Sequence, residues 1–113
     1  MAFDFPAVFI AWTTVAQRAD ADRLAAEVIH RNLAACVQID GPVTSHFRWQ
    51  GLSERTEEYR LQFKCLESQI GPLERYVLAV HPYETPEWLV VRADKVGEKY
   101  LSWARANSST PPL

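Results

Sequence analysis

The spacing of apolar residues along the chain alternates between strand-like runs and helix-like segments. The unbroken apolar run Val8–Trp12 predicts a strand that is covered on at least one face. From Asp20 onward, apolar residues recur at helical spacing as far as Leu33. Acidic residues stand in the first turn of this segment and His30 and Arg31 in its last turn, as the helix dipole favours. We therefore expect a first strand followed by a helix.

The middle of the chain has a period of two, which is typical of strands with one buried face. The pattern predicts a long strand over residues 35–50, with Gly41-Pro42 as a bend or bulge. Residues 51–55 are expected to form a polar hairpin loop. The following strand, residues 57–66, places two different sets of side chains on its faces: Tyr59, Leu61, Phe63 and Cys65 on the apolar face, and Glu58, Arg60, Gln62 and Lys64 on the polar face.

The second half of the chain repeats the helix-then-strand order. A helix is predicted from about Ser68 to Val80, with Pro72 in its first turn. Residues 81–86 must form a turn, because each of the two prolines excludes the residue before it from a helix. Residues 87–91 predict a fourth strand.

A last short helix is expected around residues 100–104, and residues 108–113 are expected to be a frayed tail. The resulting order, β-α-β-β-α-β with an extra C-terminal helix, predicts an α+β fold of the ferredoxin-like type. With 113 residues the chain is expected to form one domain, residues 1–113, whose ordered core is about residues 8–107.

Composition and charge exclude several classes of protein. Twelve Lys and Arg residues against fourteen Asp and Glu give a net charge of −2, without the concentrated positive surface that a nucleic-acid-binding protein needs. No apolar run approaches the ~20 residues that span a bilayer. Residues 1–6 lack a basic segment followed by an apolar one, so we expect no secretory signal and a cytoplasmic location.

The two cysteines, Cys36 and Cys65, are expected to be buried structural thiols. They form no CxxC pair, and two thiols are too few for a zinc site built from four thiolates. Neither is expected to have a depressed thiol pKa, since the neighbouring Lys64 should point to the opposite strand face from Cys65.

Common functions of this fold lack their residues here. Residues 57–64 begin with two acids and contain no glycine, unlike an RNA-binding strand. Residues 13–20, at the first strand–helix connection, contain no metal-binding CxxC, and no glycine-rich phosphate loop is present. The candidate residues for a hydrolase are Ser45, Ser68 and Cys65 with His30, His46 or His81. None of them belongs to a nucleophile elbow or to a recognisable triad order, so no enzyme is expected.

The segment His81-Pro82-Tyr83-Glu84-Thr85-Pro86 carries more chemistry than a plain connection needs. It places an imidazole, a phenol and a carboxylate on a loop stiffened by two prolines. Rigid polar loops are where binding residues tend to lie. A turn with an incidental histidine is the alternative interpretation.

Five segments match a known family in order and spacing: Leu33–Val37, Trp49–Gly51, Glu58 with Lys64, His81–Glu87 and Tyr100–Trp103. On these the chain resembles the CutA divalent-cation tolerance proteins from Val8 to about Asn107. The resemblance implies a cytoplasmic homotrimer, architecturally similar to the PII signalling proteins, and a link to copper or other divalent cations. It also implies a pocket near the subunit boundaries, and it brings no catalysed reaction.

The resemblance implies Glu58 and His81 as metal ligands. Several relatives carry a proposed copper ligand, a cysteine, near the end of the first strand, whereas residues 13–16 here contain none, and Gln50 replaces a frequent acid. A nitrogen and oxygen site for Cu(II) or another divalent transition metal is therefore favoured over soft Cu(I). No organic cofactor is expected. The alternative is that Glu58 pairs with Lys64 or Arg60 and that His81 caps a helix.

Two other functions stay open. The first is a PII-like sensor or scaffold trimer, whose inter-subunit pocket takes a small molecule and whose output is binding to another protein. The expected pocket residues, besides His81, are Trp49, Lys64, Tyr83, Glu84, Tyr100 and Trp103. The second is an enzyme with His81 and Glu58 as an acid–base pair.

The predicted hairpin also supports the trimer. Its arms are roughly twice as long as the first and fourth strands, so much of it should project beyond its own sheet. Neighbouring subunits are expected to cover the projecting part.

Overall fold

The computed structural model describes residues 8–108 and contains four strands and three helices in the predicted order. This confirms the α+β class and the β-α-β-β-α-β arrangement with an added C-terminal helix. The elements are β1 Val8–Val15, α1 Arg18–His30, β2 Cys36–Trp49, β3 Leu52–Leu66, α2 Glu67–Val80, β4 Leu89–Arg92 and α3 Glu98–Asn107.

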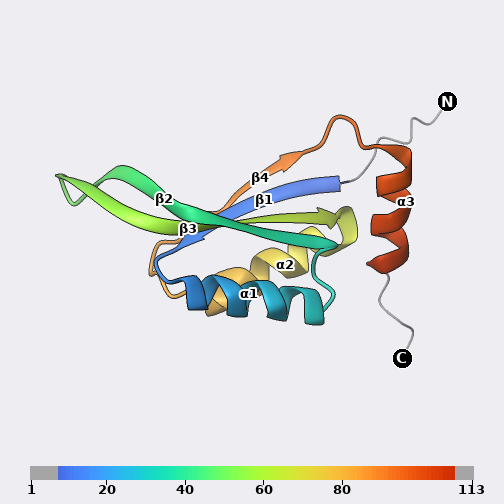
Figure 1. Ribbon diagram of the computed structural model, residues 1–113, viewed down its shortest axis with the longest axis horizontal. Coiled ribbons are helices and arrows are strands. Elements are labelled where there is room, and N and C mark those ends of the chain that lie inside the picture. The colour runs from blue at the N-terminus through green and yellow to red at the C-terminus, as the bar shows by residue number, and fades with distance from the viewer. Residues whose placement is uncertain (1–7, 109–113) are drawn as a thin grey trace.

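The four strands form one antiparallel sheet in the order β2-β3-β1-β4. Helices α1 and α2 lie side by side on one face of the sheet, and α3 stands at the end of the sheet opposite the hairpin tip (Figure 1). Among residues 8–108 no helix covers the other face of the sheet, so its side chains are available for polar contacts or a partner.

The core lies between the sheet and the two helices. Alternate residues of β1 and β3 face the helices and are fully buried, as the period of two predicts: Ala11, Thr13, Val15, Leu61, Phe63 and Cys65. Burial raises the pKa of the Cys65 thiol to about 12, which makes this cysteine unreactive at neutral pH. Cys36 is only half-buried, so the expectation of two buried thiols is correct for Cys65 alone.

Strand β3 is longer than the predicted residues 57–66, with 15 residues, and β2 has 14 residues within the predicted 35–50. The turn that joins them is only two residues, Gln50 and Gly51, which have φ angles of +50° and +80°. Positive φ at both positions matches the twist of the flanking strands, so Trp49 pairs directly with Leu52. The predicted loop over residues 51–55 is therefore wrong, because residues 52–55 belong to β3.

Other boundaries differ for local reasons. Strand β1 continues past Trp12 to Val15 because residues 13–15 pair with β3. Pro72 lies beyond the first turn of α2, and β4 begins at Leu89 rather than at residue 87. Ser108, expected in a frayed tail, is 5% exposed and its carbonyl accepts a hydrogen bond from Asn32 Nδ2. The rest of that tail, residues 109–113, lies outside the described residues.

A bulge in β2 confirms the predicted irregularity at Gly41-Pro42. The register shifts between the pairs Asp40–Arg60 and Val43–Glu58. Successive residues of a strand point to opposite faces, so the extra residue in β2 shifts the numbering of the residues that share one face. Before the bulge, the even-numbered residues of β2 share a face with the even-numbered residues of β3. After the bulge, the odd-numbered residues of β2 do so.

Beyond the bulge the hairpin leaves the body of the sheet. The last β1–β3 pair is Val15 with Tyr59, so β1 gives no cover from Glu58 to the tip. The projecting arms give the molecule a long axis of 52 Å against 33 and 21 Å (Figure 1). Phe47, Trp49 and Leu52 on these arms are 45, 47 and 65% exposed.

Gly41 is the position where the bulge depends most on the residue type. Its φ is +144°, and a Cβ there would lie 2.9 Å from Tyr59 Cδ1 and 3.0 Å from the Glu58 carbonyl oxygen. We expect Gly41→Ala to lower the free energy of unfolding by about 1–3 kcal/mol, measured by urea denaturation. The control is Gly71→Ala within α2, where the closest contact is 3.5 Å. That change should alter stability by no more than ~0.5–1 kcal/mol, because the helix propensity that Ala adds is offset by the contact of its Cβ with the following Pro72. Equal effects at both glycines would contradict the prediction.

Candidate functional site

An open cleft of about 700 Å³ lies where the hairpin leaves the sheet. Three segments form it: the end of β1, the projecting arms of β2 and β3, and the loop after α2. Its lining residues are Thr14, Ser45, His46, Phe47, Trp49, Glu54, Glu58, Tyr83, Glu84, Thr85 and Glu87.

The cleft combines negative charge with aromatic surface. Four of its lining residues are glutamates, and none is Lys or Arg. Phe47, Trp49 and Tyr83 add aromatic rings, and three hydroxyl residues and His46 complete the lining. A cleft lined by charges of one sign attracts ligands of the opposite sign, so this cleft favours a cation.

Glu58 is the buried carboxylate of the cleft, with 7% of its surface exposed. Its Oε2 accepts a hydrogen bond of 2.7 Å from the Tyr83 hydroxyl. Burial by itself raises the pKa of Glu58, but hydrogen bonds from Tyr83, Ser45 and Thr14 and the nearby His81 together bring this pKa below its usual value. Glu58 is therefore ionised at neutral pH.

Both ring nitrogens of His81 contact the protein. Nδ1 accepts the backbone N–H of Tyr83 at 3.0 Å, and Nε2 lies 3.0 Å from the Thr14 carbonyl oxygen and 3.0 Å from Thr13 Oγ1. Burial lowers the pKa of His81, and the Thr14 carbonyl and the charges of Glu58 and Asp20 offset this only partly. The imidazole is neutral at pH 7.

The loop after α2 is tied to β1 by a second contact. The buried hydroxyl of Thr13 donates a hydrogen bond of 2.7 Å to the Glu87 carbonyl oxygen. Residues 81 and 87 are thus both held at the end of β1, and the residues between them form one wall of the cleft.

The alternative pairings proposed for Glu58 are not formed. Arg60 makes a two-bond ion pair with Asp40, at 2.8 and 3.2 Å, and Lys64 Nζ donates to Gln38 Oε1 at 2.8 Å. His81 does lie at the C-terminal cap of α2, as that alternative expected, in addition to its contacts with Tyr83 and β1.

The structure brings together only part of the predicted pocket. Trp49, Glu58, Tyr83 and Glu84 line the cleft, and the His81 ring lies 5.0 Å from that of Tyr83. The other predicted pocket residues are Lys64, Tyr100 and Trp103, and they lie elsewhere in this chain.

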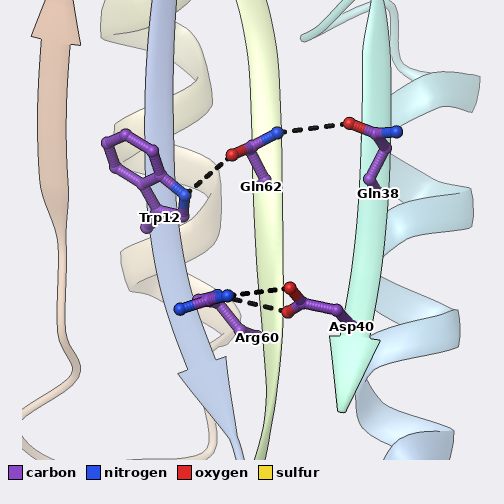
Figure 2. A network of polar contacts seen from close by, with 5 residues as sticks. All are labelled: Trp12, Gln38, Asp40, Arg60 and Gln62. Carbon is purple, nitrogen blue, oxygen red and sulfur yellow. Dashed lines mark hydrogen bonds and ion pairs between the residues drawn. The ribbon is translucent and has the colours of Figure 1, made fainter. Parts of the chain in front are cut away.

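Lys64 belongs to the helix-free face of the sheet. There Trp12 Nε1 donates to Gln62, and Gln62 donates to Gln38, which also accepts from Lys64. Figure 2 shows Trp12, Gln62 and Gln38 on the face of the sheet that points away from the helices, beside the Arg60–Asp40 pair. This network is separate from the cleft.

Tyr100 and Trp103 stack on α3 with ring centroids 5.5 Å apart. Helix α3 is at the opposite end of the molecule from the hairpin tip (Figure 1). A pocket that contains these rings together with the cleft residues would need more than one chain, so the inter-subunit pocket stays a prediction.

Sequence reasoning missed several lining residues. The sequence pattern predicts a loop at Glu54, and it offers Ser45 and His46 only as hydrolase candidates. Thr14, Phe47, Thr85 and Glu87 also line the cleft. The available signal is the alternation of polar and aromatic residues over residues 43–49. The bulge before this segment makes it impossible to tell from the alternation alone which of these residues face the cleft.

The donor set suits a weakly held cation better than a closed metal site. Within residues 8–108, no three His, Cys, Asp or Glu side chains are grouped closely enough to hold a metal ion. An ion held by only one or two carboxylates leaves coordination positions to water, which is typical of exchangeable divalent cations.

The fold and the cleft together define a ferredoxin-like α+β protein with an acidic, aromatic-walled cleft. The chain belongs to the CutA1 divalent ion tolerance protein family, whose family model matches residues 9–107. It is 38% identical over 94 residues to the divalent-cation tolerance protein CutA of Yersinia pestis, covering 83% of this chain and 79% of that protein.

Solved structures of CutA proteins have the same fold. CutA from Synechococcus elongatus PCC7942 superposes with a TM-score of 0.88 at 34% identity, covering 93% of this chain and 94% of that one. A structure of the same protein complexed with a Bis-Tris molecule gives a TM-score of 0.84 at 30% identity, covering 93% and 97%. The periplasmic divalent cation tolerance protein CutA from Archaeoglobus fulgidus gives 0.85 at 25% identity, covering 90% and 99%.

Because a relative is described as periplasmic, membership of the family does not establish the cellular location. No helix in the described part of the chain is long and apolar enough to cross a membrane.

The Tyr83–Glu58 hydrogen bond should stabilise the fold in a pH-dependent way. We expect Tyr83→Phe to lower the free energy of unfolding at pH 7 by about 1.5–3 kcal/mol, because a buried carboxylate loses a donor. The folded-state pKa of Glu58 is lowered, so its contribution is present above the unfolded-state pKa and is lost as pH falls through the folded-state pKa. The difference between the two proteins should therefore shrink toward pH 3, roughly one unit below the ordinary Glu pKa.

Urea denaturation across this pH range measures the effect. The control is Tyr59→Phe, the next residue on β3, which keeps the ring that the Arg18 guanidinium overlies. A Tyr83→Phe destabilisation that is constant with pH would contradict the assignment of the effect to the Glu58 charge.

Proposed function

We propose that this chain is a divalent-cation-binding protein that acts as a cytoplasmic homotrimer in metal tolerance, and that its cation site is the acidic cleft. The observation that carries the proposal is the lining of the cleft, which has four glutamates and no Lys or Arg. Membership of the divalent ion tolerance family supports a divalent cation as the ligand.

Glu58 is the central donor in this proposal because it is ionised and held in place by Tyr83. A second donor comes from Glu54, Glu84, Glu87 or His46, and water fills the other positions, since no three such side chains within residues 8–108 are grouped closely enough to share an ion. Such nitrogen and oxygen donors suit Cu(II) or another divalent transition metal. His81, the other predicted ligand, would first have to release the N–H of Tyr83 from Nδ1.

Removing the Glu58 charge should weaken cation binding. We expect Glu58→Gln to reduce Cu(II) affinity at least about tenfold, about 1.4 kcal/mol, measured by calorimetric titration. Glu98→Gln is the matched control, since Glu98 lies in the first turn of α3, away from the cleft. Identical isotherms for the wild type and Glu58→Gln would refute the cleft as the cation site.

A second candidate function is a PII-like small-molecule sensor. A cleft of about 700 Å³ is far larger than a single ion needs and lies in the size range of organic ligand pockets. Its aromatic rings suit an organic cation, and one relative's structure contains Bis-Tris, which is an amine with several hydroxyl groups.

The same calorimetric titration separates the two candidates. With Bis-Tris as the probe, a sensor should lose heat of binding in Trp49→Ala, whereas Cu(II) binding through carboxylates should persist in that variant. Glycerol, which has hydroxyl groups and no charge, is the control ligand.

The homotrimer is supported by unpaired edges and exposed apolar side chains. Strands β2 and β4 are the two edges of the sheet, and β4 carries Leu89 and Val91 at 57 and 47% exposure. The hairpin arms project without cover from β1. Exposed apolar edges favour pairing with another chain, and repeated head-to-tail contacts close into a ring when the rotation allows.

Light scattering after gel filtration should give a mass near three times the 12.9 kDa of one chain. We expect Leu52→Glu on the projecting hairpin to shift the protein toward the monomer, because it places a charge on an apolar contact surface. Ser53→Glu on the same arm is the control, since Ser53 is already polar and exposed. A wild-type mass of one chain at micromolar concentration would rule out the trimer.

A further inference from the structure

We propose that His81 is a positioning residue and not a ligand of the bound cation: its imidazole holds the loop of residues 81–87 so that Tyr83 reaches Glu58. This assigns a role to His81 that differs from the metal ligand predicted from the sequence. The part of the test that measures affinity rests on the proposed cation-binding function.

The first step concerns Nδ1 of the imidazole. A backbone N–H can only donate, and the N–H of Tyr83 points to His81 Nδ1 at 3.0 Å. Nδ1 must therefore be unprotonated, and its lone pair is occupied by this bond. A metal at Nδ1 would displace the bond that fixes Tyr83.

The second step concerns Nε2. It lies 3.0 Å from the Thr14 carbonyl oxygen, which can only accept, so Nε2 carries the ring proton. Thr13 Oγ1, also 3.0 Å away, uses its own proton on the Glu87 carbonyl and so presents a lone pair to Nε2. Neither ring nitrogen has a free lone pair for a metal.

The third step is the effect on the cleft. His81 Nδ1 orients the backbone of Tyr83, and the Tyr83 hydroxyl bonds Glu58 at 2.7 Å. Thr13 fixes the other end of the loop through Glu87. Glu84 and Thr85, which line the cleft between these two anchors, therefore depend on the imidazole for their placement.

Nitrogen-15 NMR of the wild-type protein tests the assignment directly. We expect His81 to be the neutral tautomer with the proton on Nε2, and its two nitrogen shifts to stay unchanged when Zn(II) is added. The side-chain carboxyl carbon of Glu58 should shift in the same titration. A proton on Nδ1, or movement of the Nδ1 resonance to a metal-bound position, would overturn the proposal.

Two substitutions separate positioning from coordination. His81→Asn places an amide oxygen near the Nδ1 position, where it can accept the Tyr83 N–H. We expect His81→Asn to keep Zn(II) affinity within about threefold of the wild type and His81→Ala to lose about tenfold or more. His30→Ala, at the end of α1, is the control and should bind as the wild type does. Equal losses in folded Asn and Ala variants would overturn positioning.

The two proposals can fail separately. If the wild type does not bind Zn(II) or Cu(II), the cation function is refuted, while the tautomer and the shift of the Tyr83 amide in His81→Ala still decide the positioning role. If either substitution prevents folding, the tautomer and Zn(II) titration of the wild-type protein decide it.

Discussion

The hydrogen bond between Tyr83 and the buried carboxylate of Glu58 connects two parts of the molecule that are otherwise distant in the chain. One is the loop after α2, and the other is the hairpin at the point where β1 stops covering it. A buried charge is tolerated only where donors surround it, and Tyr83, Ser45 and Thr14 supply them. This arrangement fixes the loop against the hairpin and keeps one of the four glutamates of the cleft ionised.

Much of the fold follows from local patterns that the sequence displays. The alternation around Leu61 and Phe63 defines the buried face of β3, and the two prolines of residues 81–86 mark a rigid loop. The turn was missed because Gln50 at positive φ is not a typical hairpin signal, so residues 52–55 read as a polar loop. For the site, Glu58 and His81 were found through family resemblance, but Glu54 and Glu87 depend on how distant segments meet. Lys64 lies on the same polar face of β3 as Glu58, but the two side chains have different surroundings. Lys64 donates to Gln38 on the sheet, whereas Glu58 lines the cleft.

The chemistry of the cleft sets limits on the way it can hold a cation. Its oxygen donors come from three segments, two of which, the hairpin and the loop, are joined at Glu58. A site of this kind exchanges its ion more readily than a closed four-ligand site, since water keeps several coordination positions. Exchangeable binding suits a protein that buffers or senses cations, whereas a structural metal would be built into the core.

The bulge at residues 41–42 has a consequence for how the two halves of β2 can change over evolution. Because the bulge adds one residue, Gln38 and Asp40 before it share the helix-free face with Ser45 and Phe47 after it. Deleting one of the two bulge residues would keep Asp40 opposite Arg60 and Val43 opposite Glu58, so it would remove the bend without changing which side chains of this arm line the cleft. A residue lost just after Val43 would have no bulge to absorb it. With the pairing kept up to Val43, His46 and Arg48 would lie opposite Thr56 and Glu54, and a guanidinium would enter an acidic cleft.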